Sequence, residues 1–254
     1  MNKRVFIIVA LGILGLFSIF YLKRTTVNPK VGKNTIIVGT NAEYAPFSFQ
    51  ENNTIIGFDI DLIQEIAKRL GKTIELQDMP FDALIPALQM GAIHVIAAGI
   101  TPTPERAQRI IFTKPYLQND PLLIVSNTAK PITTLEQLST KKVGVNEGFT
   151  ADYYMSKIEC PELIRFASAM ELFMALESNR VDAIVAARNS IQPLIAHYGA
   201  QKFIATPIAD TSDEYALAIS KKYPELLEPI QKILDEIAID GTIDALKKRW
   251  PDLK

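Results

Sequence analysis

The pattern of hydrophobic and polar positions divides the chain into two parts. Two basic residues precede an apolar run over residues 5–22, which only Ser18 and small glycines interrupt, and two more basic residues follow it. A helix of about eighteen residues rises about 27 Å, close to the roughly 30 Å hydrocarbon core of a bilayer. The run therefore predicts a segment that delivers the rest of the chain across a membrane.

The same run leaves the fate of the N-terminus open. A cleaved secretory signal needs small residues before the cut, where bulky residues such as Phe20 and Leu22 stand. A lipoprotein signal needs a cysteine just after the run, but the only cysteine is Cys160. An uncleaved anchor within residues 1–26 fits best, and a signal peptide with a poor cleavage site is the alternative. We therefore expect a protein of the periplasm or cell surface that residues 5–22 tether to the inner membrane.

Beyond the apolar run, short apolar strands alternate with amphipathic helices. Residues 35–40 are β-branched and apolar, which is typical of a strand buried on both faces. Residues 59–70 carry an apolar stripe, with Asp59 as N-cap and Gly71 as C-cap. Further strands are expected at 54–58, 73–77, 92–97, 122–126, 142–146, 163–166, 181–186 and 214–220, and further helices at 82–89, 133–138, from 150, 169–177, 190–197, 224–239 and 242–250. This order predicts an α/β fold of two lobes, with largely parallel sheets and helices on both faces.

Composition narrows the classes of function. The net charge is -1, so no general field attracts nucleic acid or anionic lipid. His94 and His197 stand far apart without Cys or His companions, and His94 lies in an apolar run typical of a structural histidine. We expect no metal, no cofactor and no nucleic-acid partner.

Residues suited to ligand binding gather in loops that follow predicted strands, where α/β folds place their clefts. Gly99 would let a ligand approach the backbone, Thr101 offers a hydroxyl, and Arg106 can present a planar fork to a carboxylate. In the second lobe, Gly148 and Thr150 join a strand to a helix N-terminus that suits an anion. Taken singly, each threonine could be a helix cap and Arg106 a surface cation. Together, at strand ends in both lobes, these residues favour a ligand.

Six stretches in this order and spacing carry a family resemblance: GTNAEYAPFSF (39–49), GFDIDL (57–62), FDALIPALQMG (81–91), AAGITPTPER (97–106), KVGVNEGFT (142–150) and NRVDAIVA (179–186). From about residue 35 to 250 the chain resembles the periplasmic amino-acid-binding proteins of ABC importers, the solute-binding family for polar and basic amino acids. The resemblance implies a two-lobed periplasmic-binding-protein fold (type II), whose two crossover hinge strands, near 116–121 and 211–215, let the lobes close over a ligand. Lobe 1 would hold residues 34–117 and 214–254, and lobe 2 residues 118–213.

The resemblance also implies roles in the cleft. Arg106 matches the arginine that pairs with the ligand α-carboxylate, and Gly148 and Thr150 match second-lobe contacts to that group. Thr101 and the carbonyl of Gly99 match groups at the α-ammonium. Tyr44 and Phe81 match the aromatic walls that sandwich the ligand side chain. Asn41 falls where many members have an aspartate that reads that side chain. The candidate ligand-binding residues are Asn41, Glu43, Tyr44, Phe81, Ala98, Gly99, Thr101, Arg106, Gly148, Thr150 and Ala187.

The second lobe departs from the family's pattern at Ala187. Members usually carry an aspartate there that binds the α-ammonium, and an ammonium in a dry cleft without a counter-charge is costly. Glu43 or Glu147 could supply the charge, or Thr101 and backbone carbonyls could suffice. A local shift of the helix could also bring in another group, or the ligand could differ from an ordinary α-amino acid.

The sequence thus predicts a monomeric solute-binding protein that captures an amino acid and passes it to the membrane subunits of an ABC permease. The carboxylate and amide groups near two aromatic walls favour arginine or another basic amino acid over glutamine. A membrane-tethered sensory domain is the first alternative. An enzyme such as a dehydratase on the same fold is the second, although no nucleophile–base pair or metal cluster stands out.

Overall fold

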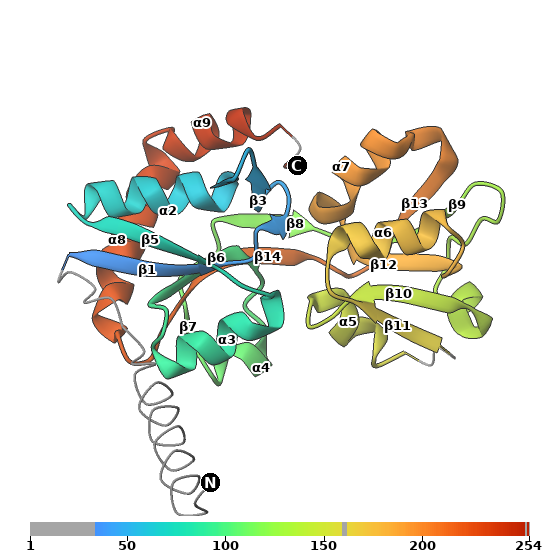
Figure 1. The fold of residues 1–254 in the computed structure, drawn as a ribbon, viewed down its shortest axis with the longest axis horizontal. Coiled ribbons are helices and arrows are strands. Elements are labelled where there is room, and N and C mark those ends of the chain that lie inside the picture. Colours follow the sequence, from blue (N-terminus) through green and yellow to red (C-terminus); the bar gives the residue numbers. More distant parts are fainter. Residues whose placement is uncertain (1–33, 159–161, 252, 254) are drawn as a thin grey trace, which may run out of the picture. The chain divides into compact units, whose positions relative to one another are not determined.

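The computed structural model describes residues 34–158, 162–251 and 253, which form two α/β lobes built on separate sheets (Figure 1). We call the part on the sheet β5-β1-β6-β14-β7 lobe 1, and the part on the sheet β11-β10-β12-β9-β13 lobe 2. The predicted anchor or signal segment at residues 1–26 lies outside the described residues. Within the described ranges, no helix is both long enough and apolar enough to cross a bilayer.

Lobe 1 takes elements from both ends of the described chain. It contains β1 (Thr35–Thr40), β2 (Glu43–Tyr44), β3 (Ser48–Glu51), β4 (Thr54–Ile56), α2 (Phe58–Arg69), β5 (Thr73–Asp78), α3 (Phe81–Met90), β6 (Val95–Ile100), α4 (Pro104–Ala107), β7 (Ile111–Phe112), β14 (Asp213–Ile219), η3 (Pro224–Leu226), α8 (Leu227–Ile239) and α9 (Thr242–Arg249). The hinge strand β8 (Leu117–Asp120) pairs with β14 where the chain passes between the lobes.

Lobe 2 is continuous in sequence. It contains β9 (Leu122–Asn127), η1 (Glu136–Thr140), β10 (Lys142–Asn146), α5 (Thr150–Met155), β11 (Glu162–Phe166), α6 (Ala169–Glu177), β12 (Ala183–Ala187), α7 (Arg188–Tyr198), η2 (Ala200–Lys202) and β13 (Phe203–Pro207). In Figure 1, α6 and α7 lie on one side of this sheet and α5 on the other.

Each sheet is mixed, which corrects the expectation of largely parallel sheets. Strand β1 runs parallel to β5 and β6, and β10 runs parallel to β11 and β12. Strands β14 and β9, which follow the two crossovers, are antiparallel to their neighbours β6 and β12. The reason is geometric. The parallel strands run toward the cleft and end at it, whereas a strand that follows a crossover starts at the cleft and runs away from it.

The central strands β1 and β6 of lobe 1 are buried on both faces, so helices must cover each side of the sheet. Ile36 and Val38 share a core with Leu62 and Ile63 of α2 and with Ile230 of α8. Helix α3 packs on β1 and β6, and Figure 1 shows it on the side of the sheet away from α2. Because α8 and α9 also contact α2, the C-terminal helices pack back on lobe 1, as expected.

Three local predictions were wrong. Gly57, not Asp59, is the N-cap of α2, because Asp59 already lies within the first turn and its carboxylate turns toward Gly99. Strand β6 covers 95–100 rather than 92–97, since Ala92 N–H still donates to Ala87 O at the end of α3. The helix expected at 133–138 is the short 3₁₀ turn η1, which begins at Glu136.

His94 is a structural histidine, as predicted. Its Nδ1 accepts a hydrogen bond from Ile37 N–H at 3.2 Å, and its ring packs on Tyr223 with centroids 4.2 Å apart. Burial lowers the pKa of His94, which favours the neutral ring that this acceptor role requires.

Candidate ligand-binding site

The end of β6 is shaped by Gly99, which has a φ of 57°. A Cβ at this position would lie 2.6 Å from Cε1 of Tyr44, so a side chain would be both strained and obstructed. The Gly99 N–H donates to Asp59 Oδ2 at 2.6 Å, and the Tyr116 hydroxyl donates to Asp59 Oδ1 at 2.6 Å. These bonds fix the strand end against helix α2 and the chain just before the hinge strand.

Arg106 lies at the junction of the lobes. Thr103 caps the short helix α4 by accepting from Arg106 N–H at 3.3 Å, which sets the start of the side chain. The side chain is 4% exposed, and its guanidinium donates to Thr101 O at 2.7 Å within lobe 1 and to Gly148 O at 2.8 Å in lobe 2. Burial lowers the pKa of Arg106 from its ordinary value, but an arginine remains a cation.

Aromatic rings from both lobes pack on one another next to this guanidinium, which lies over Phe81 of lobe 1 and, 5.9 Å from the ring centroid, over Tyr153 of lobe 2. Phe81 stacks on Phe149 with centroids 4.1 Å apart, and the guanidinium carbon of Arg106 lies 5.3 Å from the Phe81 centroid. Tyr44 packs edge-on against Phe149 and stacks on Phe47, each with centroids 5.1 Å apart. Rings from lobe 1 therefore contact a ring from lobe 2 directly.

A buried carboxylate, Asp213, lies where β14 enters lobe 1. The Thr150 hydroxyl of lobe 2 donates to Asp213 Oδ2 at 2.5 Å. Burial raises the pKa of Asp213 to about 6, and Asp120 adds to the rise, while Thr150, Arg106 and Thr101 oppose it. The charges of the Asp213 carboxylate and the Arg106 guanidinium therefore act on each other between the lobes.

The neighbouring Asp120 has a structural role at the hinge. It is fully buried and pairs with Asp213 across β8 and β14. Its carboxylate accepts hydrogen bonds from the Tyr215 hydroxyl and, at 3.1 and 3.2 Å, from Asn189 N–H. Asp120 therefore joins the hinge to the start of α7.

Four other predicted residues have surroundings of their own. Asn41 is buried at the end of β1, where its Nδ2 donates to Met79 O at 3.4 Å. Glu43 is exposed and lines a groove of about 520 Å³ between the β2–β3 hairpin and helices α6 and α7. Ala187 is buried at the end of β12, and its carbonyl accepts from the Ser190 hydroxyl at 2.7 Å. Ala98 is buried within β6 beside Gly99.

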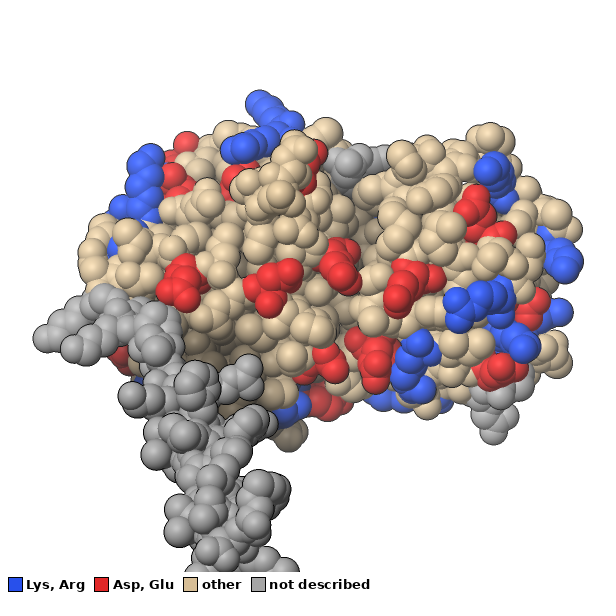
Figure 2. Space-filling model, viewed as in Figure 1, with Lys and Arg blue, Asp and Glu red and all other residues tan. Residues whose placement is uncertain are grey.

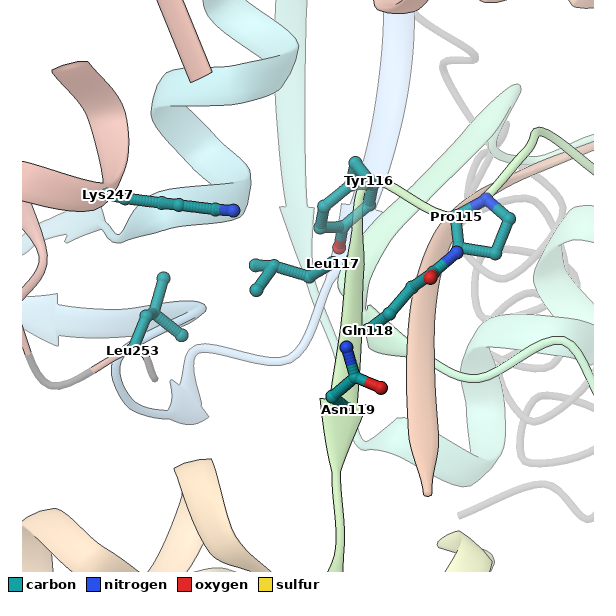
Figure 3. Close-up of a pocket in the computed structure, with 7 residues that line it drawn as sticks. All are labelled: Pro115, Tyr116, Leu117, Gln118, Asn119, Lys247 and Leu253. Atoms are coloured by element: carbon teal, nitrogen blue, oxygen red, sulfur yellow. The ribbon is translucent and has the colours of Figure 1, made fainter. Parts of the chain in front are cut away.

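A second pocket lies behind the hinge. It has a volume of about 340 Å³, and Figure 3 shows Lys247 of α9 reaching toward the β8 segment that forms its other wall. Its lining residues are Pro115, Tyr116, Leu117, Gln118, Asn119, Lys247 and Leu253. None of the predicted ligand-binding residues lines this pocket, so it is separate from the Arg106 site.

The charged side chains are not evenly spread over the surface. Figure 2 shows acidic side chains across the middle of this face and basic side chains mostly toward its edges. Among the residues that the structure describes, no group of three or more His, Cys, Asp or Glu side chains is placed to hold a metal ion.

Residues 36–252 match the family described as bacterial extracellular solute-binding proteins, family 3. The chain belongs to this family. A probable histidine-binding protein of Campylobacter jejuni is 33% identical over 217 residues, which cover 85% of this chain and 84% of the relative. The arginine-binding extracellular protein ArtP of Bacillus subtilis is 32% identical over 233 residues, covering 86% and 87%.

The solved structure of an ancestral arginine-binding protein bound to arginine shares the fold. It superposes with a TM-score of 0.80 at 36% identity and covers 86% of this chain and 98% of that chain. The comparison confirms the two-lobed binding-protein fold expected from the sequence. It also places the chain among extracytoplasmic binding proteins, as the family description states.

The sequence analysis assigns no role to two residues that contact the predicted ligand-binding residues. Phe149 lies inside the stretch KVGVNEGFT but was not assigned a role, although an aromatic ring in a strand-end loop is a signal for ligand stacking. Asp213 lies just before a predicted strand and in a predicted hinge. Nothing in the local sequence indicates that its carboxylate contacts Thr150 of the other lobe. Thr150 and Asp213 are 63 residues apart in sequence, so only the folded chain brings them together.

Proposed function

We propose that this protein captures an amino acid between its two lobes and delivers it to an ABC permease. The observation that carries the proposal is the buried Arg106, whose guanidinium reaches both a lobe 1 carbonyl and a lobe 2 carbonyl. A ligand α-carboxylate is a better acceptor than either neutral carbonyl, because charge-assisted hydrogen bonds are roughly twice as strong. Ligand binding at this point would therefore strengthen the link between the lobes.

The ligand we favour is a basic amino acid, with arginine first and glutamine as the competitor. Tyr44, Phe81 and Phe149 offer faces for a flat guanidinium or amide, and cations are attracted to such faces. Relatives at similar identity are named for arginine or histidine. Asn41 and Glu43 are the residues that we assign to the end of the ligand side chain.

Thermal unfolding across the amino acids tests the proposal. A ligand present at 100 times its Kd stabilises a protein by about 2.7 kcal/mol. We expect such a shift for one or a few amino acids, with arginine among them. An unchanged melting temperature across all twenty would contradict the proposed function.

We assign the protein a binding role and not an enzymatic one. The relatives named above are binding proteins, and the cleft residues described here have hydrogen-bond partners that suit recognition. Mass analysis of arginine and glutamine after prolonged incubation should recover both unchanged. Turnover of either would move the protein into the class of enzymes on this fold.

The remaining features of the proposal concern the membrane. We propose that the protein is a monomer, that residues 5–22 stay attached as an anchor, and that the permease subunits contact the rims of both lobes. The apolar run and the bulky residues before any cut support the anchor. Intact-mass analysis of protein from the membrane fraction should show the full N-terminus, whereas a chain that starts near residue 25 would identify a signal peptide.

A further inference from the structure

An α-amino acid presents two opposite charges on one carbon, so a cleft that desolvates it needs a cation and an anion close together. Arg106 is the cation of this cleft. The family's usual anion is missing, because Ala187 occupies its position and is itself buried. Glu43 and Glu147, the other acidic residues near the strand-end loops, are both exposed. The counter-charge must therefore be sought among buried carboxylates.

Four aspartates are buried in the part of the chain that the structure describes: Asp59, Asp120, Asp152 and Asp213. Asp59 is held by Gly99 N–H and the Tyr116 hydroxyl, and Asp120 by Asn189 N–H and the Tyr215 hydroxyl. Their acceptor oxygens are thus engaged in fixing the backbone and the hinge.

Asp152 is also accounted for within lobe 2. Its carboxylate forms an ion pair with Arg165 at 2.9 Å and accepts from Gly148 N–H at 3.0 Å. A carboxylate that is already neutralised by an arginine is a poor partner for a second cation.

Asp213 differs from the other three. The hydrogen bond to its carboxylate comes from the Thr150 hydroxyl of lobe 2, and the Thr101 hydroxyl of lobe 1 lies close enough to lower its pKa. A hydroxyl can rotate its hydrogen and can accept as well as donate, so both threonines could turn an acceptor lone pair toward an arriving ammonium. Thr101 is also the residue that the family resemblance places at the α-ammonium.

The charges near Asp213 fit a zwitterion. Arg106 lies close enough for its charge to act on Asp213, and both side chains are almost fully buried, at 4% and 7% exposure. Arg106 belongs to lobe 1, and Asp213 is the first residue of β14, where the chain enters lobe 1. Arg106 donates to Gly148 of lobe 2, and Asp213 accepts from Thr150 of the same segment. A carboxylate on Arg106 would bring the adjacent ammonium toward Asp213.

We propose that Asp213 is the counter-charge for the α-ammonium of the bound amino acid, in place of the aspartate that the family usually carries at the position of Ala187. The inference rests on the proposed amino-acid-binding function and names the residue that completes it. It also explains how a family member retains an α-amino acid site after losing that aspartate.

The test compares ligands with and without the ammonium. Calorimetric titrations use L-arginine and 5-guanidinopentanoate, which lacks only the α-amino group, with L-glutamine and glutaramate as a second pair. Truncating one partner of a buried charge pair typically weakens binding at least about thirtyfold. Wild-type protein should bind 5-guanidinopentanoate at least thirtyfold more weakly than arginine, and Asp213→Asn should bind arginine with a similar loss and discriminate the two ligands by less than about threefold.

Controls separate recognition from folding. Asp210→Asn changes an exposed aspartate just before the same strand and should leave both affinities unchanged. Asp213→Glu keeps the charge and should retain more affinity than Asp213→Asn, and adding Ala187→Asp to Asp213→Asn should restore part of it. Thermal unfolding without ligand checks that each variant is folded.

The outcomes are distinct. Wild-type protein that binds no amino acid would remove the proposed function and this inference with it. Wild-type protein that binds arginine while Asp213→Asn still prefers arginine over 5-guanidinopentanoate by the wild-type ratio would overturn the inference alone. Equal losses of both ligands in Asp213→Asn would assign Asp213 to the guanidinium and would likewise overturn it.

Discussion

Two buried carboxyl groups in this protein have similarly raised pKa values in different surroundings. Burial raises the pKa of Asp59 and of Asp213 to about 6 in each case. Asp59 accepts from a backbone N–H and a tyrosine hydroxyl within lobe 1, so its surroundings are fixed. Asp213 lies between the lobes and faces two threonine hydroxyls and a guanidinium.

The difference shows that a perturbed pKa alone does not mark a binding residue. Structural carboxylates and functional carboxylates are desolvated alike, and the identity of their donors distinguishes them. A donor fixed in the backbone indicates a carboxylate that holds the fold together. Hydroxyls that approach from two lobes, as at Asp213, can rotate and accept in turn from a ligand.

The largest change in stability should come from Asp59→Ala. The substitution leaves Gly99 N–H and the Tyr116 hydroxyl buried without their acceptor, at about 1–3 kcal/mol for each group. We expect the free energy of unfolding to fall by about 4 kcal/mol, measured by denaturant titration of ligand-free protein. Asp213→Ala should lower the free energy of unfolding much less. Equal losses in the two variants would contradict the distinction between Asp59 and Asp213.

The pH dependence of stability should also separate the two carboxylates. A raised pKa means that the folded protein holds a proton more strongly than the unfolded chain, so the free energy of unfolding falls as pH rises from about 4 to above 6. A shift of about two pH units corresponds to roughly 3 kcal/mol per buried group. Asp213→Asn should therefore be as stable as wild type at pH 4 and more stable at pH 7.5.

A bound ligand should remove the pH dependence of stability that Asp213 contributes, but not the part that Asp59 contributes. A bound ammonium would lower the pKa of Asp213, so saturating arginine should remove its share of the pH dependence while leaving that of Asp59. Urea titrations at pH 4, 6 and 7.5, with and without arginine, give both quantities. A pH dependence that is unchanged in Asp213→Asn would show that this carboxylate is already ionised in the folded, ligand-free protein.

The smallest effect is expected at the exposed rim of the cleft. Glu43 lines the outer groove and is exposed to solvent, where a single ion pair contributes about 0–1 kcal/mol. Glu43→Gln should weaken arginine binding by less than about fivefold and leave glutamine binding unchanged in calorimetric titrations. A loss as large as that of Asp213→Asn would return the counter-charge to Glu43.

The sequence predicted the elements with strong periodicity and the grouping of three polar or small residues around one strand end. Strand β1 and helix α6 have the expected bounds, because their apolar patterns are set by their own neighbours. Arg106, Thr101 and Gly99 lie close together, since one strand end and the loop after it carry all three.

The parts that the sequence could not predict depend on contacts between distant segments. Asp59 looks like a helix cap in sequence, and its real partners Gly99 and Tyr116 are 40 and 57 residues away. The Thr150–Asp213 bond spans 63 residues and joins two lobes. No local pattern encodes such a pair, so the role that we propose for Asp213 rests on the three-dimensional structure.

The most direct test of the account is the affinity of Arg106→Ala for arginine. Removing this buried cation should weaken binding at least about thirtyfold while the protein stays folded, since truncating one member of a desolvated charge pair costs roughly 2–5 kcal/mol. The matched control is Arg109→Ala, three residues further along the chain. The Arg109 side chain is exposed and donates to Gln89 Oε1. Calorimetry should show near-normal binding for Arg109→Ala and a large loss for Arg106→Ala, whereas near-normal affinity in Arg106→Ala would contradict the central claim.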